Sequence, residues 1–243
     1  MIGTLYLIPS ALSECETDEI LPLKVKQIIC TLHFFIVENE RTARRFLVKA
    51  GYPSIANAQL MVLDKHKNES ELSGFLDAAM KGSDIGLITE AGAPAVADPG
   101  AVMVKLAHEK NIRVKPLVGP SSILLALMAS GMNGQSFSFH GYLPIESKDR
   151  IAKIKELERI SGVLDQTQVF IETPYRNNPL LADIISCCSA RTLLGIASNI
   201  TASDERIETH AMEYWKSHLP DIKKKPTVFT LYSIARAKKT GNN

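Results

Sequence analysis

The sequence predicts an α/β fold in two domains, because short apolar runs that suit buried strands alternate with amphipathic runs that suit helices. The clearest evidence is a pair of consecutive strand–loop–helix units, one over residues 85–109 and one over residues 114–131. Units of this kind place helices on both faces of a mainly parallel sheet. A chain of 243 residues with 45% hydrophobic content can supply the core that such a fold needs.

The first half begins with a predicted strand at Thr4–Ile8, which is apolar almost throughout and is therefore expected to be buried. Further strands are expected at 33–37, 85–88 and 114–118, and helices at 21–32, 40–50, 68–81, 101–109 and 123–128. Gly51, Gly82 and Gly131 close three of these helices, because glycine readily takes the left-handed conformation that ends a helix.

The second half continues the alternation with shorter connections. Strands are expected at 137–143, 167–173, 192–197, 206–210 and 227–233, and helices at 147–160, 178–187 and 211–218. We therefore expect an N-terminal α/β domain over residues 1–118, a C-terminal α/β domain over 119–235, and a polar tail over 236–243.

The bulk properties argue against several functional classes. A net charge of +2 gives no strong electrostatic case for binding a nucleic acid or a membrane. Local basic clusters remain at Arg41, Arg44 and Arg45, at Lys223–Lys225, and at Arg236, Lys238 and Lys239. The four cysteines form no Cys-x-x-Cys pair, so we predict reduced thiols in a cytoplasmic protein without a metal site. We expect neither a signal peptide nor a membrane span.

The segment Thr89–Gly100 contains two prolines, two glycines and two carboxylates, so it is expected to be a loop at the carboxyl end of a buried strand. In open α/β sheets, ligands bind at that edge. Gly119–Ser122 follows the next strand in the same way, and Ser122 is an expected helix N-cap. The two loops predict a ligand site, against the simpler interpretation that both are ordinary tight connections.

Seven segments resemble, in sequence and in order, the tetrapyrrole methylase superfamily. They are Gly3–Ile8, Glu40–Arg45, Lys65–Glu69, Glu90–Gly100, Pro116–Ser122, Phe139–Pro144 and Val169–Arg176. The most similar branch contains the small-subunit ribosomal RNA methyltransferases that modify the 2′-oxygen of a cytidine ribose.

The resemblance implies two α/β domains with a methyl-donor cleft between them, S-adenosyl-L-methionine as the donor, and a homodimer. It implies ribosomal RNA or the small ribosomal subunit as the substrate and partner. The resemblance also implies the donor-binding residues, and their places at strand ends or helix starts agree with this: Pro9, Gly92, Ala93, Pro94, Val96, Ser121, Ser122 and Glu172.

A hydroxyl acceptor needs its proton removed or shared during attack on the methyl group. Glu90 and Asp98 are the nearest carboxylates in the loop and are the predicted catalytic residues, with Glu38, Glu40 and His66 as more distant alternatives. For each loop carboxylate the structural role of capping the loop is favoured over a role as a base, and Asp98 could cap the helix that follows.

The chain departs from this branch in places that keep other functions open. Pro9–Glu14 stands where the branch has Ala-Thr-Pro-Ile-Gly-Asn, and Glu90 and Ala93 stand where it has Asp and Thr. One alternative is a methyltransferase that acts on a small molecule such as a tetrapyrrole. The other is a protein that binds S-adenosyl-L-methionine without catalysis.

Overall fold

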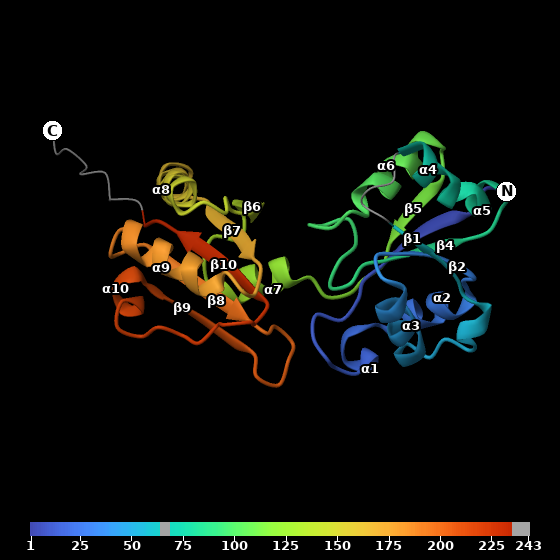
Figure 1. Cartoon of the computed structure of the whole chain (residues 1–243), viewed down its shortest axis with the longest axis horizontal. Coiled ribbons are helices and arrows are strands. Elements are labelled where there is room, and N and C mark those ends of the chain that lie inside the picture. Colours follow the sequence, from blue (N-terminus) through green and yellow to red (C-terminus); the bar gives the residue numbers. More distant parts are fainter. Residues whose placement is uncertain (64–68, 235–243) are drawn as a thin grey trace. The chain divides into compact units, whose positions relative to one another are not determined.

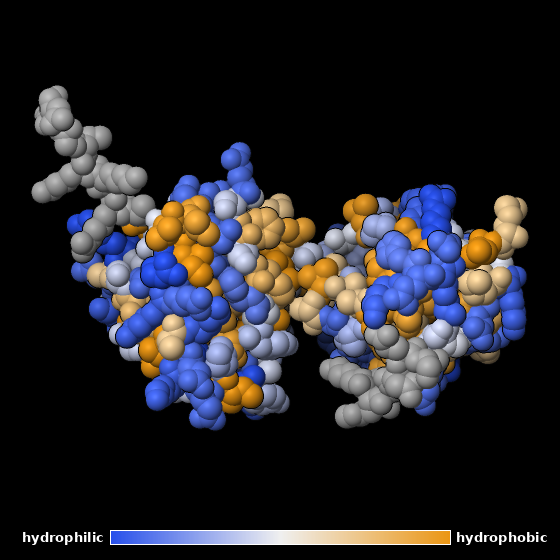
Figure 2. Space-filling model, turned by 90° about the horizontal axis from the view of Figure 1, so that it is seen from above, coloured by the Kyte–Doolittle hydropathy of each residue, from blue (hydrophilic) through white to orange (hydrophobic). Residues whose placement is uncertain are grey.

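The computed structural model describes residues 1–63 and 69–234. They form two compact α/β units, which divide between Ser121 and Ser122 (Figure 1). Each unit contains one five-stranded sheet with helices packed against it. Hydrophilic and hydrophobic residues are interspersed on the visible face of each unit (Figure 2).

The sheet of the first unit is parallel throughout and has the strand order β3-β2-β4-β1-β5. Its strands are β1 (Thr4–Ile8), β2 (Phe34–Val37), β3 (Gln59–Val62), β4 (Ile85–Ile88) and β5 (Arg113–Pro116). Ile8 and Val37 both pair in register with Ile88, so the carboxyl ends of β1, β2 and β4 lie side by side.

Helices cover both faces of this sheet because successive strand residues point to opposite sides. Phe35 and Val37 pack against α2 (Leu23–Thr31) and α3 (Glu40–Lys49), whereas Ile36 faces the other cluster. That second cluster includes the helices α4 (Glu69–Ser73), α5 (Asp77–Met80) and α6 (Ala101–Glu109), with the 3₁₀ turn η2 (Gly74–Leu76) between α4 and α5. The short segments α1 (Thr17–Ile20) and η1 (Ile55–Asn57) complete the unit.

The sheet of the second unit is mixed and has the order β6-β7-β10-β8-β9. Its strands are β6 (Phe137–Tyr142), β7 (Thr167–Glu172), β8 (Leu193–Ser198), β9 (Arg206–Ala211) and β10 (Thr227–Tyr232). Its helices are α7 (Ser122–Ser130), α8 (Ser147–Leu164), α9 (Asn177–Cys187) and α10 (Met212–Trp215). Side chains of α8, α9 and α10 join one core with Phe170 of β7 and Phe229 of β10.

The prediction of an α/β fold is confirmed, but the expectation of a mainly parallel sheet is wrong for the second unit. Only β6 and β7 pair in parallel there, and β10 and β8 pair antiparallel with each of their described neighbours. The connection between β8 and β9 covers residues 199–205, which is too short for the crossover that a parallel pair requires.

Three local predictions also need correction. Strand β3 was not predicted, because Gln59–Val62 is short and has no clear alternation. The helix expected over 68–81 is divided between α4 and α5 by η2, which begins at Gly74, and residue 68 lies outside the described part. The helix expected over 211–218 is the short helix Met212–Trp215. No helix in the described parts of the chain is long and apolar enough to cross a membrane.

Candidate functional site

Glu38 fixes the start of the long loop that follows β4. Glu38 comes directly after β2, and its Oε1 accepts a hydrogen bond from the Thr89 hydroxyl at 2.8 Å and from the Glu90 amide at 3.1 Å. Because β2 and β4 are adjacent and in register, a residue just after one strand reaches the first residues after the other. Thr89 is buried, whereas Glu90 is exposed at the surface of the loop.

Asp98 stabilises the same loop, the one after β4, through hydrogen bonds to its backbone. Its carboxylate accepts hydrogen bonds from the Gly100 amide at 2.6 Å and from the Ala95 amide at 2.9 and 3.0 Å. Burial raises the pKa of the Asp98 carboxyl, and the negative charge of Glu38 acts in the same direction. Hydrogen bonds from Gly100, the Thr89 side chain and Ala95 oppose that rise without cancelling it, so the pKa of Asp98 stays above its ordinary value. This geometry favours the structural alternative for Asp98.

The backbone of this loop is strained at two alanines. Ala95 and Ala97 have φ angles of 65° and 62°, in the left-handed region that residues with a Cβ rarely enter. Such a conformation persists only where neighbouring contacts enforce it, and it is concentrated at functional sites. The Asp98 carboxylate supplies one such contact through Ala95, so the loop has a fixed shape.

The loop after β1 is tied to the loop after β4. Ser10 and Gly92 form an antiparallel bridge, in which the Ser10 amide donates to the Gly92 carbonyl at 2.9 Å and the Gly92 amide donates back at 3.1 Å. The Ser10 hydroxyl also donates to the Thr89 carbonyl at 2.6 Å. The loop after β5 joins them, because a Cβ on Gly119 would lie 2.2 Å from Pro9 Cγ.

The structure therefore brings Pro9 and Gly92 together, as the sequence-based prediction of a ligand site requires. Gly92 and Pro94 are buried, Ala93 is half-buried, and Val96 is 47% exposed. Ser121 is half-buried at the end of the first unit. The assignment of these residues to a ligand stays a prediction.

Glu172 and Ser122 belong to the second unit. Glu172 ends β7, its side chain is fully buried, and its Oε1 accepts hydrogen bonds from the Thr173 amide at 2.6 Å and from Arg176 Nη2 at 2.7 Å. Its Oε2 is buried without any hydrogen-bond partner among the described residues. An unpaired buried carboxylate oxygen is costly, which makes this atom a candidate acceptor for a ligand hydroxyl or ammonium group. Ser122 is the first residue of α7 and not its N-cap, since the helix begins one residue earlier than predicted.

A cavity of about 330 Å³ lies in the first unit at the carboxyl ends of β1, β2 and β4. It is lined by three chain segments and by part of α3, including Ser10–Cys15, Glu38, Asn39, Thr42, Arg45, Lys49 and Thr89–Ala91. Sequence reasoning did not find this cavity, because its walls come from segments far apart in the chain. The sequence did indicate parts of it, because Thr89–Ala91 belong to the loop that was predicted to bind a ligand and Glu38 was one of the alternative bases.

Glu40, a further candidate base, is not among the residues that line this cavity. Glu40 accepts hydrogen bonds from Arg44 Nε at 2.9 Å and Arg44 Nη2 at 2.7 Å on the surface of α3. His66 lies outside the described residues.

No family model matches the chain. It is 26% identical over 204 residues to ribosomal RNA small subunit methyltransferase I of Vibrio cholerae, which covers 84% of this chain and 67% of that protein. It is 29% identical over 205 residues to the protein of the same name from Escherichia coli O157:H7, covering 84% and 68%.

Solved structures resemble both units. The methyltransferase CobJ has a TM-score of 0.63 at 15% identity and covers 95% of this chain and 94% of that one. The cobalt precorrin-4 methyltransferase CbiF has a TM-score of 0.60 at 13% identity, covering 94% of each chain. At these identities the likeness concerns the fold.

Proposed function

We propose that this chain, a methyltransferase with the tetrapyrrole methylase fold, transfers a methyl group from S-adenosyl-L-methionine to a ribose 2′-hydroxyl in small-subunit ribosomal RNA. The supporting observation is its similarity, over 84% of its length, to proteins named ribosomal RNA small subunit methyltransferase I. The family resemblance and the two-domain α/β fold predicted from the sequence are confirmed.

The residues present fit the donor in two respects. Gly92 has a φ of 77°, and a Cβ there would meet Leu12 at 3.2 Å, so this tight approach of the loops after β1 and β4 requires a residue without a side chain. Glu172 Oε2 offers a buried acceptor without a partner. We propose that the donor is held by Pro9, Gly92, Ala93, Pro94, Val96, Ser121, Ser122 and Glu172.

Methyl transfer depends mainly on how the donor and the acceptor are positioned. When bound, S-adenosyl-L-methionine supplies an electrophilic methyl group, and transfer to an oxygen is an in-line displacement that depends on alignment. The braced loop around Asp98 meets this need, because it is already held in one shape by its own hydrogen bonds. The sequence predicted Glu90 and Asp98 as catalytic residues; the hydrogen bonds of Asp98 favour a structural role for it, and the catalytic role of Glu90 stays a prediction.

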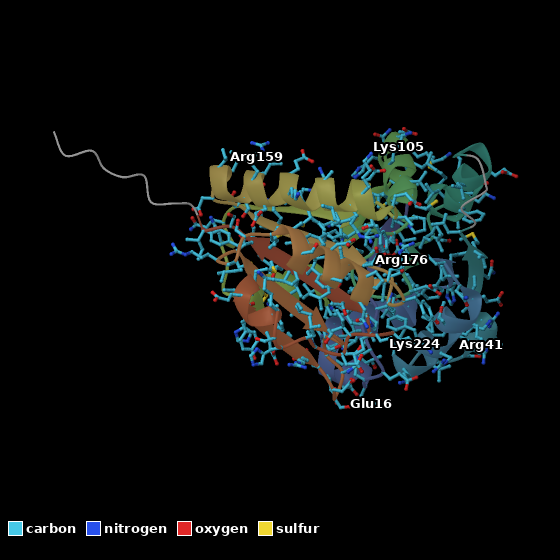
Figure 3. All side chains as sticks on the ribbon, turned by 60° about the vertical axis from the view of Figure 1, so that its left-hand side comes forward. Glu16, Arg41, Lys105, Arg159, Arg176 and Lys224 are labelled. Atoms are coloured by element: carbon cyan, nitrogen blue, oxygen red, sulfur yellow. The ribbon has the colours of Figure 1, made fainter. Side chains whose placement is uncertain are left out.

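The first turns of α3 present basic side chains that suit an RNA backbone. Arg41 (labelled in Figure 3) and Arg45 are exposed, and Arg45 forms an ion pair with Glu14 at 3.5 Å. Arg44 is engaged with Glu40 and also donates to the Ile55 carbonyl at 3.4 Å. Phosphate neutralisation by exposed arginines gives affinity that does not depend on sequence.

We expect ribose-methylation mapping of small-subunit ribosomal RNA to show one 2′-O-methyl mark that is lost when the gene is deleted. Re-expression of the wild-type chain should restore the mark, and the same chain carrying Gly92→Asp should not. An unchanged methylation pattern in a deletion strain of an organism without a second copy of the family would contradict the RNA substrate.

We also propose a homodimer located in the cytoplasm, where ribosomal subunits are available. The resemblance supports the dimer, and the second unit exposes apolar side chains at Leu124 and Met128 of α7, which are 51% and 76% exposed. Light scattering should give twice the 26.7 kDa mass of the chain at micromolar concentration. A monomer mass across that range would rule out the dimer.

A further inference from the structure

We infer that Glu38 accepts the proton of the ribose hydroxyl, and that the cavity of the first unit receives the target nucleotide. This inference rests on the proposed function, because it assumes transfer from S-adenosyl-L-methionine to an RNA hydroxyl. It concerns a residue that lies about fifty positions before the loop that contains Glu90 and Asp98.

The cavity has the size and the location expected of a binding site for a small methyl acceptor. Its volume of about 330 Å³ lies at the lower end of the range for small-molecule sites. It lies at the carboxyl edge of a parallel sheet, where ligands bind in open α/β folds. Enzymes that act on a base take the nucleotide out of its stack into a pocket, and we propose one flipped nucleotide as the occupant of this cavity by analogy.

The cavity is directly connected to the loop proposed to hold the donor. Ser10 lines the cavity and is bridged to Gly92 by two backbone hydrogen bonds. Glu90 and Ala91 also line the cavity and lead directly into Gly92. A methyl acceptor in the cavity would therefore lie against the same loops that are proposed to contact the donor.

Glu38 is the carboxylate whose position is best defined in this cavity. Both of its hydrogen bonds, from the Thr89 hydroxyl at 2.8 Å and the Glu90 amide at 3.1 Å, end on Oε1. They fix the carboxylate through Oε1, and we assign the proton of the ribose hydroxyl to the other oxygen, Oε2. A base held in place before the substrate arrives meets the geometric requirement of proton transfer.

The other carboxylates near the cavity are less suitable. Asp98 accepts from two backbone amides. Glu14 lies 3.5 Å from Arg45 in an ion pair, and its side chain is 90% exposed. Glu90 is exposed, and it contributes its backbone amide to the anchoring of Glu38.

The step balances as follows. The ribose oxygen forms a bond to the methyl carbon while the carbon–sulfur bond breaks, and the electron pair of that bond stays on sulfur, which becomes a neutral thioether. The hydroxyl proton moves to Oε2 of Glu38 and is released to solvent after product leaves. No oxidant, reductant or metal is needed.

Glu38→Gln separates the chemical role from the structural one. The glutamine amide oxygen can still accept from Thr89 and from the Glu90 amide, so the loop remains anchored. We expect kcat on small-subunit RNA to fall by about 10²- to 10³-fold. Donor affinity by calorimetry and the Tm should stay at wild-type values, and rates are expressed per donor-binding site so that any unfolded fraction is excluded.

Matched variants complete the test. Glu109→Gln makes the same change at the end of α6, away from the carboxyl edge, and should leave kcat unchanged. If Glu38→Gln keeps a kcat within about threefold of wild type, or if Glu90→Gln alone abolishes the rate, the role of Glu38 is overturned while the proposed function stands. If the wild-type chain binds the donor but methylates no small-subunit RNA, the proposed function fails, and the role of Glu38 fails with it.

Discussion

Replacing Gly92 with aspartate is expected to weaken binding of S-adenosyl-L-methionine by about 100-fold or more, which corresponds to roughly 3 kcal/mol. Gly92 combines a φ of 77° with burial, and a Cβ there would already lie 3.2 Å from Leu12. A charged side chain on that Cβ would have to enter the space beside the loop or push the Ser10 bridge apart. Calorimetric titration of the purified variant measures the loss directly.

Gly51→Asp is the matched control for backbone strain. Gly51 has a similar φ of 83°, follows the C-cap of α3 in the same unit, and has nothing within 4 Å of an added Cβ. Both variants should lose about 1 kcal/mol of stability from the left-handed backbone, but only Gly92→Asp should lose donor affinity. A folded Gly92→Asp variant that binds the donor normally would remove Gly92 from the proposed donor site.

Replacing Glu172 with glutamine should weaken donor binding by about 10- to 100-fold, since hydrogen bonds to charged groups contribute about 1.5–3 kcal/mol. The amide oxygen can still accept hydrogen bonds from the Thr173 amide and from Arg176, so the hydrogen bonds at the C-terminal end of β7 are kept. The amide nitrogen then takes the place of the unpartnered Oε2 and presents a donor where an acceptor stood. Calorimetry and thermal unfolding on the same preparation separate affinity from stability.

Glu208→Gln provides the comparison for Glu172. Glu208 pairs with Arg206 at 2.6 Å on the edge strand β9, and its side chain is 31% exposed. This pairing lowers the pKa of the Glu208 carboxyl, so the variant removes an equivalent charge from the same unit. Donor affinity should not change in Glu208→Gln, and equal affinity of Glu172→Gln and wild type would show that the buried oxygen does not meet the donor.

The sequence could predict the elements whose signal is local. Strand β4 and helix α6 were expected at 85–88 and 101–109 and have those bounds, because an apolar run, a loop rich in proline and glycine, and an amphipathic run follow one another without interruption. The mixed sheet of the second unit could not be predicted in this way. The direction of a strand depends on its partner, and β10 pairs with β7 and β8 over long separations.

In the candidate site, too, features with a local sequence signal could be predicted and features set by long-range contacts could not. The positions of Pro9 and Gly92 at strand ends were visible in the sequence, as was the possible bracing role of Asp98. The contact between Glu38 and Thr89 joins residues 51 positions apart and exists only because β2 and β4 are neighbours in register. The unpartnered oxygen of Glu172 is likewise a property of the folded packing, since the sequence shows only that a glutamate ends a strand.

The bridge between Ser10 and Gly92 makes the loops after β1 and β4 one mechanical element. Displacing either strand end stretches two peptide hydrogen bonds, so the loops can shift only together. If one substrate shifts this pair of loops when it binds, the resulting change in binding free energy of the other substrate is the same whichever arrives first. The two proposed substrates would then be thermodynamically linked through a pair of backbone amides.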